Sequence, residues 1–383
     1  MAPWIFGFSA LVSSLGNLHP DLGLGFNVST ISQVRTNMLE IASASWELGT
    51  AAQALTEISW PALSVFNKTA FPPPTRLVGS HIPVDVLAIA NKTVSAKPAD
   101  SLALIPNQGS AADPASIGVS VLLANWTRSD PSNPAYADAA AGQLKYLLDY
   151  TPRTMMGAIS HRSREVQLWS DFVYMVPPFI AYYGTLAGGA QGSVYLQTAY
   201  DQCRLYRDGL RDESGFWRHI AQGPFQDTTH WATGNAWAAA GMMRVLATLN
   251  NTESGGRFSE QQADLEEWIE EILVASWDKQ TPDGALRNVI DDPTSFVDMA
   301  STALMAATTY RLAVFKNDAT LLSSANRAFK VVKLNVDRNG WLQNVVNPMT
   351  FHEPLPPHEH SPEGQAFVLL LQAAWEAVLA LDN

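Results

Sequence analysis

The chain has 383 residues, of which 47% are hydrophobic and 16% are charged, and its formal net charge is −12. This composition excludes a disordered protein and leaves room for one large domain or a few smaller ones. No apolar run of about eighteen residues and no block of Lys or Arg occurs, so we expect neither a membrane nor a nucleic-acid partner. The single cysteine, Cys203, excludes a disulfide framework. The 12 tryptophans weakly indicate carbohydrate binding, because indole rings stack on sugar rings.

The N-terminal residues 1–30 are interpreted as a signal peptide or an N-terminal extension. Met1–Gly16 is apolar, but no Lys or Arg opens it, so a buried N-terminal segment is an equal alternative. Five N-x-S/T sequons favour secretion slightly over a cytoplasmic location. They lie at Asn27, Asn67, Asn91, Asn125 and Asn250.

Apolar periodicity predicts helices along most of the chain. The first is expected over about Ser32–Phe66, with Pro61 ending or kinking it, and Pro72–Pro114 is expected to be irregular, with a short strand or helix at Val84–Ala90. The later helical segments are Ile117–Trp126, Ala135–Leu148, Phe172–Leu186, Ser193–Leu210, Trp231–Leu249, Ser259–Ser276, Val297–Val314, Thr320–Leu334 and Glu363–Leu381. Strand alternation is nearly absent, which indicates an all-α protein.

A loop pattern with a central glycine occurs four times, each time before a helix rich in small residues. The loops are Met155–His161, Glu213–His219, Pro282–Asn288 and Arg338–Asn344. A unit of two helices and two loops cannot bury its own apolar faces, so we expect the units to close into an (α/α) toroid. A linear α-solenoid is the alternative. We assign residues 31–383 to one catalytic toroid domain, expected to be a monomer.

In such a toroid the first turns of the inner helices meet at one mouth. Their free N–H groups favour a locally positive pocket that suits a carboxylate. His161, His219, His230 and His360 lie in loops before helix openings, and Trp169, Trp231 and Trp237 mark helix starts. A single loop histidine is usually a solvated polar residue, but their equivalent repeat positions favour a site. No His spacing typical of zinc occurs, so no metal is expected.

Asp171 is the best candidate for a catalytic acid, because it follows Trp169 and precedes an apolar run. Burial against the indole would raise its pKa, and a helix N-terminus would lower it, so burial has to dominate for proton donation. The alternative is a helix cap. Asp227 and Asp298 are weaker candidates, and Glu363 is interpreted as a charge in the first turn of a helix.

At these residues the sequence resembles the unsaturated rhamnogalacturonyl hydrolases, glycoside hydrolase family 105. The pattern W-x-D-x-x-x-M-x-x-P-F runs from Trp169 to Phe179, and G-F-W-x-H runs from Gly215 to His219. W-x-x-G-N-x-W follows at Trp231–Trp237, and weaker likenesses begin at Asp298 and Glu363. The resemblance covers roughly residues 140–381.

The resemblance implies a six-hairpin toroid that removes a 4,5-unsaturated uronic acid from the non-reducing end of an oligosaccharide. Asp171 would protonate the enol-ether double bond and then activate the water that adds beside it. The implied substrate-binding residues are His161, Arg162, Trp169, His219, Trp231, Thr233, Asn235, Trp237 and His360, with no metal and no organic cofactor.

Two departures from the family pattern stand out. Thr233 occupies the place of an arginine that suits a uronate carboxylate, so Arg162, Arg218 or the helix ends would have to replace that charge. A second upstream aspartate has no clear counterpart, and Asp113 is only a candidate. Two other functions stay open: a polysaccharide lyase that uses His219 and Tyr174, and a sugar-binding toroid without activity.

Overall fold

The computed structural model describes residues 23–381, so the predicted segment Met1–Gly16 lies outside the described part. Its α-helices are α1 Val28–Ile41, α2 Ser45–Ser59, α3 Val84–Ala96, α4 Gly118–Thr127, α5 Ala135–Lys145, α6 Phe172–Met175, α7 Pro177–Ala187, α8 Gly189–Leu210, α9 Ala232–Asn251, α10 Ser259–Asp278, α11 Met299–Lys316, α12 Leu322–Leu334 and α13 Pro362–Leu379. Two antiparallel pairs of two-residue strands pair β1 Leu168–Trp169 with β2 Ile220–Ala221 and β3 Leu286–Arg287 with β4 Val297–Asp298. A 3-10 turn, η3, covers Asp113–Ile117, and a π-helical turn, η4, covers Tyr146–Tyr150.

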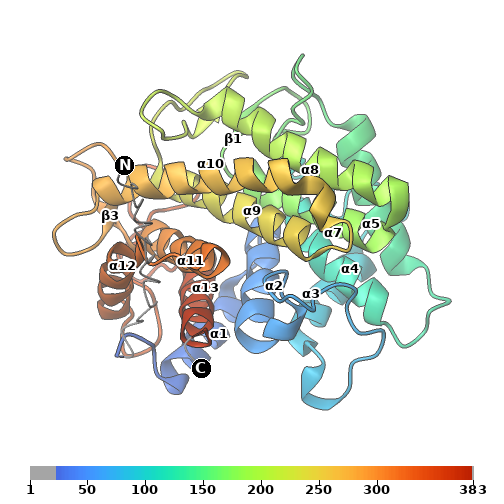
Figure 1. Ribbon diagram of the computed structural model, residues 1–383, viewed down its shortest axis with the longest axis horizontal. Coiled ribbons are helices and arrows are strands. Elements are labelled where there is room, and N and C mark those ends of the chain that lie inside the picture. The colour runs from blue at the N-terminus through green and yellow to red at the C-terminus, as the bar shows by residue number, and fades with distance from the viewer. Residues whose placement is uncertain (1–22, 382–383) are drawn as a thin grey trace, which may run out of the picture.

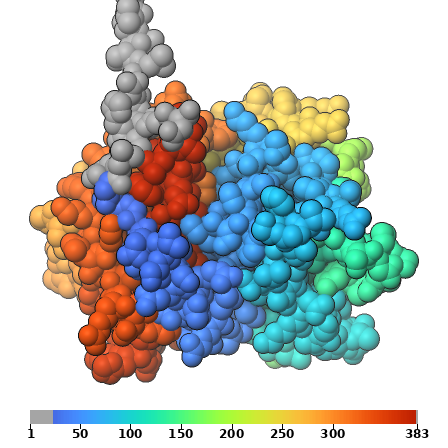
Figure 2. Space-filling view, turned by 90° about the horizontal axis from the view of Figure 1, so that it is seen from below, coloured from blue at the N-terminus to red at the C-terminus, as the bar shows by residue number. Residues whose placement is uncertain are grey.

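The helices form six hairpins around a closed ring. An outer helix precedes an inner helix in each hairpin, and the inner ring runs through α2, α4, the broken helix α6–α7, α9, α11 and α13. The last inner helix, α13, packs against both α11 and α2, which closes the ring. Figures 1 and 2 show the two ends of the described chain side by side, α1 and α2 in blue against α13 in red. This closure confirms the toroid and excludes a linear solenoid.

Most predicted helices are present, and the differences have local causes. The segment Ser32–Phe66 is two helices, α1 and α2, because the chain is extended at Ala42 and Ala44. Pro177 has no N–H to continue the preceding turn, so α6 ends and α7 begins there. The short element expected at Val84–Ala90 is the full helix α3. Within residues 23–381, every helix is too short or too polar to cross a membrane.

The four predicted glycine loops share one backbone conformation. Each central glycine has a positive φ, between +81° and +104°, which residues with a Cβ rarely adopt. In each loop the residue three before the glycine donates a backbone hydrogen bond to the carbonyl just after it. The glycines are Gly157, Gly215, Gly284 and Gly340. The sequence repeat therefore marks a tight turn between an outer helix and the next inner helix.

Side chains from the inner helices fix three of these turns. In each case a polar side chain near the helix start accepts the N–H of the residue two after the glycine. The pairs are Trp217 with Asn235, Leu286 with Thr302, and Leu342 with Gln365. Because all three acceptors are fully buried, these bonds hold the loops rigidly above the ring.

Small residues let neighbouring inner helices approach closely. A Cβ added at Gly241 of α9 would lie 2.2 Å from the carbonyl oxygen of Val173 in α6. A Cβ at Gly118 of α4 would lie 2.3 Å from the ring of Phe179 in α7. These contacts are too short for any larger residue, so the glycines set the width of the ring.

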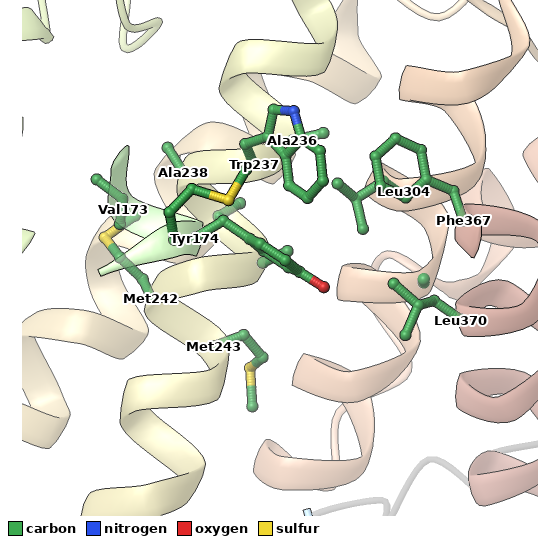
Figure 3. Close-up of a cluster of buried hydrophobic side chains, with 14 of the residues drawn as sticks. Val173, Tyr174, Ala236, Trp237, Ala238, Met242, Met243, Leu304, Phe367 and Leu370 are labelled. Atoms are coloured by element: carbon green, nitrogen blue, oxygen red, sulfur yellow. The ribbon is translucent and has the colours of Figure 1, made fainter. Parts of the chain in front are cut away.

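Large apolar side chains fill the centre of the ring. The rings of Tyr174 and Trp237 lie 4.3 Å apart, and Trp237 meets Phe367 of α13 edge to face at 4.7 Å (Figure 3). Beyond Tyr174, the buried guanidinium of Arg244 lies 4.6 Å from the Tyr174 ring centroid. Arg311 pairs with Glu57 at 2.7 Å in the same region. These side chains close the centre of the ring, so any cavity at one end of the ring axis is closed at its base.

Replacing Gly284 by alanine is expected to destabilise the fold. Its φ of +104° disfavours alanine, and the new Cβ would lie 2.6 Å from the carbonyl oxygen of Arg327. We expect Gly284→Ala to lower the free energy of unfolding by about 1–3 kcal/mol in urea titrations. Gly256→Ala is the control, because a Cβ there meets nothing within 4 Å. Equal losses in the two variants would contradict this account of the turn.

Candidate active site

A cavity of about 370 Å³ opens at the end of the ring where the inner helices begin. Trp46 of α2, Asp113 of η3, Asp171 before α6, Trp231 before α9 and Glu363 of α13 all line it. The predicted convergence of helix starts on one mouth is therefore confirmed. The remaining lining residues are Gln108, Ser110, His161, Arg162, Trp169, Met175, Phe225, Trp237, Pro348, Met349 and Phe351.

The charged side chains that line the cavity are mostly acidic, whereas the helix N-termini had led us to predict a positive pocket. Three carboxyl groups, those of Asp113, Asp171 and Glu363, face the cavity, and Arg162 is the one lysine or arginine among the described lining residues. The sequence-based expectation of a positive pocket is therefore wrong for the side chains, although the helix N-termini do point toward the cavity. The positive helix ends instead lie beside carboxyl groups.

Asp171 lies at the start of α6 but does not cap it, because its side chain accepts no hydrogen bond from the helix backbone. Oδ2 lies 3.5 Å from Nε2 of His219 and accepts a 3.2 Å hydrogen bond from Ser170. Burial alone would raise the pKa of Asp171, but the contact with His219 outweighs it, and the pKa is lowered. The condition for proton donation by Asp171, that burial dominates its pKa, is therefore not met, and this carboxyl is ionised at neutral pH.

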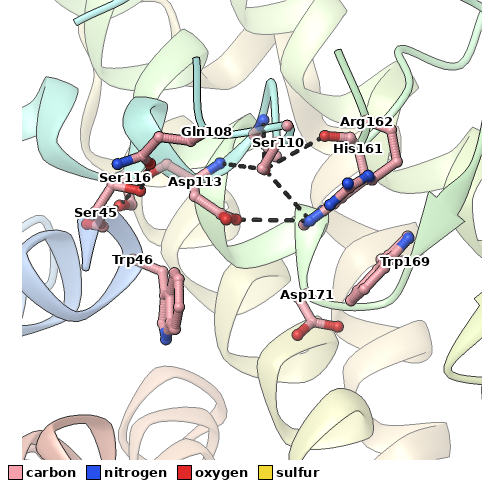
Figure 4. Close-up of polar contacts among 12 residues, drawn as sticks. Ser45, Trp46, Gln108, Ser110, Asp113, Ser116, His161, Arg162, Trp169 and Asp171 are labelled. Carbon is pink, nitrogen blue, oxygen red and sulfur yellow. Dashed lines mark hydrogen bonds and ion pairs between the residues drawn. The ribbon is translucent and has the colours of Figure 1, made fainter. Parts of the chain in front are cut away.

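Asp113 is the carboxyl whose pKa burial does raise, to about 7. The negative charge of Asp171 adds to the effect, while Ser110 and Arg162 oppose it. Asp113 Oδ1 lies 3.6 Å from Nε2 of His161 (Figure 4). Asp113, which was only a candidate in the sequence, thus keeps its proton at weakly acidic pH in the cavity where Asp171 is ionised.

His161, Arg162 and Trp169 form one wall of the cavity. The imidazole of His161 stacks on the Trp169 indole with 4.8 Å between centroids, and burial lowers the His161 pKa to about 3. The guanidinium carbon of Arg162 lies 5.9 Å from the Trp169 ring centroid. His161 is therefore neutral at pH 7, and Arg162 carries the positive charge of this wall.

His219 connects the cavity to the protein surface through Asp227. Its Nδ1 lies 2.9 Å from Asp227 Oδ2, and the same oxygen lies 2.9 Å from Nε2 of the exposed His352. Burial disfavours the charged form of His219, but its pairs with Asp171 and Asp227 prevail and raise its pKa. Asp227 also accepts hydrogen bonds from Thr229. A chain of acidic and imidazole groups therefore runs from Asp171 outward.

Aromatic rings enclose the catalytic side of the cavity. Phe351 meets His219 at 4.6 Å and Trp231 at 5.4 Å, both edge to face. Its φ is +65°, an uncommon conformation for a bulky residue, and its carbonyl accepts a hydrogen bond from Asn288. The loop that carries Pro348, Met349 and Phe351 thus forms part of the cavity wall.

Four predicted substrate-binding residues do not line the cavity: His219 lies behind Asp171, at 3.5 Å from its carboxylate, and the other three contact the rest of the fold. Thr233 is fully buried and donates a 3.0 Å hydrogen bond to Asp298. Asn235 is fully buried. Its side-chain amide accepts a hydrogen bond from the Trp217 N–H and donates to the carbonyls of Trp217 and Trp231. His360 stacks on Trp341 with 4.0 Å between centroids and does not line the cavity. We therefore replace these predicted substrate contacts by structural roles.

Sequence reasoning missed several lining residues in the N-terminal half. Trp46 is the second residue of α2, a position like those of the tryptophans at the start of α9. The sequence pattern predicted a single helix over Ser32–Phe66, so the start of α2 was not recognised. Ser110 and Gln108 lie in a region expected to be irregular, where the glycine repeat gives no reference. Glu363 lies in the first turn of α13 as predicted, but it is buried rather than solvated.

A ring of six helical hairpins is a fold that this chain shares with solved glycoside hydrolases. The family model for Glycosyl Hydrolase Family 88 matches residues 89–377, most of the chain, so this protein belongs to glycosyl hydrolase family 88. It is thus a glycosidase. None of the curated proteins compared with the chain matches it.

Solved structures share the fold at low sequence identity. A possible member of family GH105 from Klebsiella pneumoniae is 17% identical, with a TM-score of 0.72 and 98% coverage of both chains. A possible GH105 member from Salmonella enterica is 18% identical, with a TM-score of 0.69 and coverage of 91% and 92%. An unsaturated glucuronyl hydrolase specific for heparin is 11% identical, with a TM-score of 0.62 and coverage of 92% and 96%.

Replacing Asp227 by asparagine is expected to destabilise the protein in a pH-dependent way. The pKa of Asp227 is lowered and that of His219 is raised, so their attraction is complete only when both are charged. It weakens as pH falls below about 4 and as pH rises above about 6.5, the ordinary values for the two groups. We expect Asp227→Asn to lose about 1–2 kcal/mol near pH 5 and less near pH 8.5.

Urea titrations at the two pH values measure this difference. Asp278→Asn is the matched control, because Asp278 is exposed and pairs only with the exposed Lys279. A loss for Asp227→Asn that is the same at both pH values would contradict the assigned charge states.

Proposed function

We propose that this glycosidase removes 4,5-unsaturated uronyl residues from the non-reducing ends of oligosaccharides. The observation that carries the proposal is the pair of carboxyl groups, Asp113 and Asp171, whose pKa values are shifted in opposite directions in one cavity. Such a pair supplies one proton donor and one base at the same pH. Family membership and the fold shared with an unsaturated glucuronyl hydrolase support this substrate class.

The reaction needs a proton and a water molecule. The protonated carboxyl gives its proton to C4 of the enol ether, and the positive charge that develops at C5 is shared with the ring oxygen. The ionised carboxyl takes a proton from water as the water oxygen bonds to C5. The resulting hemiketal opens to a ketone and a hemiacetal at C1, and the hemiacetal releases the remaining oligosaccharide as an alcohol.

The charge states of the free protein support this division of roles. Asp113 holds its proton up to about pH 7 and is the donor, while Asp171 is ionised and is the base. The sequence alone suggested that Asp171 performs both steps. His219 holds Asp171 in its ionised form, so it supports the base rather than the donor.

Arg162 is suited to bind the uronate carboxylate. It lines the cavity, and its Nε is buried without a hydrogen-bond partner. Its contact with Glu165 is long, at 3.7 Å, so its donors are available to a ligand. Thr233 carries no charge and lies outside the cavity, which leaves Arg162 to provide the cation. The indoles of Trp46 and Trp169 lie on either side of Asp171 and offer faces for a sugar ring (Figure 4).

Exchanging either carboxyl for an amide is expected to stop turnover while the fold stays intact. We expect Asp113→Asn and Asp171→Asn to lose about 10²–10⁴-fold in kcat. The assay follows the ultraviolet absorbance of the conjugated double bond, which this reaction consumes. Appearance of that absorbance from a saturated polysaccharide would instead identify a lyase, and tryptophan quenching without turnover would identify a binding protein.

The pH profile of kcat/KM separates the two assignments. With Asp113 as donor, activity falls as pH rises through about 7, and it falls on the acid side only below the usual carboxyl range. His219→Gln serves as a control: it should keep the fall in activity above about pH 7, because that fall is assigned to Asp113. If Asp113→Asn retains full activity and this limb, Asp171 performs both steps.

Removing the charge of Arg162 is expected to weaken substrate binding. We expect Arg162→Leu to raise KM roughly ten- to a hundredfold, because a hydrogen-bonded charge pair is lost, and to change kcat less. Arg218→Leu is the matched control, since Arg218 is exposed and does not line the cavity. An unchanged KM for Arg162→Leu would exclude Arg162 from carboxylate binding.

A further inference from the structure

Trp46 and Glu363 meet on the cavity wall where the first and last inner helices close the ring. Each residue comes from the first turn of its helix, Trp46 from α2 and Glu363 from α13. Trp46 Nε1 donates a 2.9 Å hydrogen bond to Oε2 of Glu363. Both residues line the cavity, although Glu363 is only 2% exposed. The Glu363 carboxyl therefore faces a ligand space and is shielded from bulk solvent.

The second oxygen of this carboxyl has no partner. Oε1 is buried, and it neither accepts nor donates a hydrogen bond within the described part of the chain. The charged groups that raise the pKa of Glu363 are carboxyls, those of Glu47 in α2, Asp171 before α6 and Asp298 before α11. Burial first, and these negative charges next, raise the pKa of Glu363 well above its usual value.

The position of the proton follows from the hydrogen bond. An indole N–H only donates, so the oxygen that it meets, Oε2, acts as an acceptor. The proton of the neutral acid is then carried by Oε1, the oxygen without a partner. A buried O–H without an acceptor is costly, which makes an acceptor on a bound molecule the natural partner.

We propose that Glu363 is a substrate-binding residue that determines specificity, donating a hydrogen bond from its neutral carboxyl to an uncharged oxygen of a sugar ring stacked on Trp46. The inference rests on the proposed function, since it takes the ligand to be a sugar. An uncharged oxygen fits because a carboxylate here would share the cavity with the ionised Asp171, and the negative charges of Glu47 and Asp298 also act at this position. The uronate carboxylate is left to Arg162, which Figure 4 shows across the cavity from Trp46. These two contacts together orient the sugar.

Substitutions that keep or remove the donor test the proposal. Glutamine retains an N–H donor of similar size, whereas leucine fills the space without one. Binding is measured by tryptophan fluorescence in the Asp171→Asn background, with an unsaturated uronyl disaccharide from a glycosaminoglycan lyase as the probe. We expect Glu363→Leu to weaken binding by about tenfold and Glu363→Gln to stay within about threefold of the background.

Glu359→Leu and Glu359→Gln are matched controls, because Glu359 is exposed in the loop before α13. A second readout needs no ligand: the infrared difference between the unsubstituted chain and Glu363→Gln at neutral pH should show the C=O stretch of a protonated carboxyl. It detects the neutral carboxyl even where Glu363→Leu folds poorly.

The outcomes separate this inference from the function on which it rests. Failure of the Asp171→Asn background to bind the disaccharide overturns the proposed function, and this inference with it. Binding that is equally tight in Glu363→Leu overturns only the role of Glu363. Absence of the protonated carboxyl band also overturns it, because an ionised Glu363 has no proton to donate.

Discussion

The closure of the ring by α13 against α2 determines where every active-site group lies. Because the inner helices enter the ring in the same sense, their first turns meet at one mouth, and residues separated by more than three hundred positions become neighbours. Trp46 and Glu363 are the clearest case, with a separation of 317 positions and a direct hydrogen bond. The small residues between inner helices keep the ring narrow, and the aromatic plug around Trp237 gives the cavity its floor. Fold stability and site geometry therefore depend on the same packing.

Helix starts create a common environment, yet the carboxyl groups placed there have different hydrogen-bond partners. Asp298 caps α11 and accepts hydrogen bonds from Ala300, Ser301, Val346 and Thr233. Asp171 accepts one from Ser170 and faces the buried His219, while among residues 23–381 the side chain of Glu363 has only the Trp46 N–H. Burial favours the neutral acid and polar partners favour the carboxylate, so the number and kind of partners decide the outcome at each position. The opposite pKa shifts of Asp113 and Asp171 are one instance of this balance.

The sequence predicted the fold well because its signals are local. Apolar spacing marked the helices, and the four glycines marked turns that need positive φ, so the ring followed from the repeat. The first two hairpins lack these loops, and Trp46, Ser110 and Asp113 were missed or left uncertain for that reason. Charge states were less predictable, because Asp171 is buried as expected but meets a histidine from a loop 48 positions away. Motif position was also a poor guide to role: Asn235 belongs to the same motif as Trp231, yet its amide only binds backbone.

Thr233 stands where the family pattern has an arginine, and its side chain takes part in a buried hydrogen-bond network. Thr233 Oγ1 donates to Asp298 Oδ2, which also accepts from Ser301, while Oδ1 binds the backbone of Val346. This network joins α9, α11 and the loop before α13 beneath the cavity, and an arginine would have to leave it to reach a ligand. With Thr233 committed to the network, the lysine or arginine charge among the described lining residues is that of Arg162, whose guanidinium carbon lies 5.9 Å from the Trp169 ring centroid. The cavity is then positive near Arg162 and carries no positive side chain near Glu363, so a sugar ring with one carboxylate, as proposed above, would fit in one orientation better than in the other.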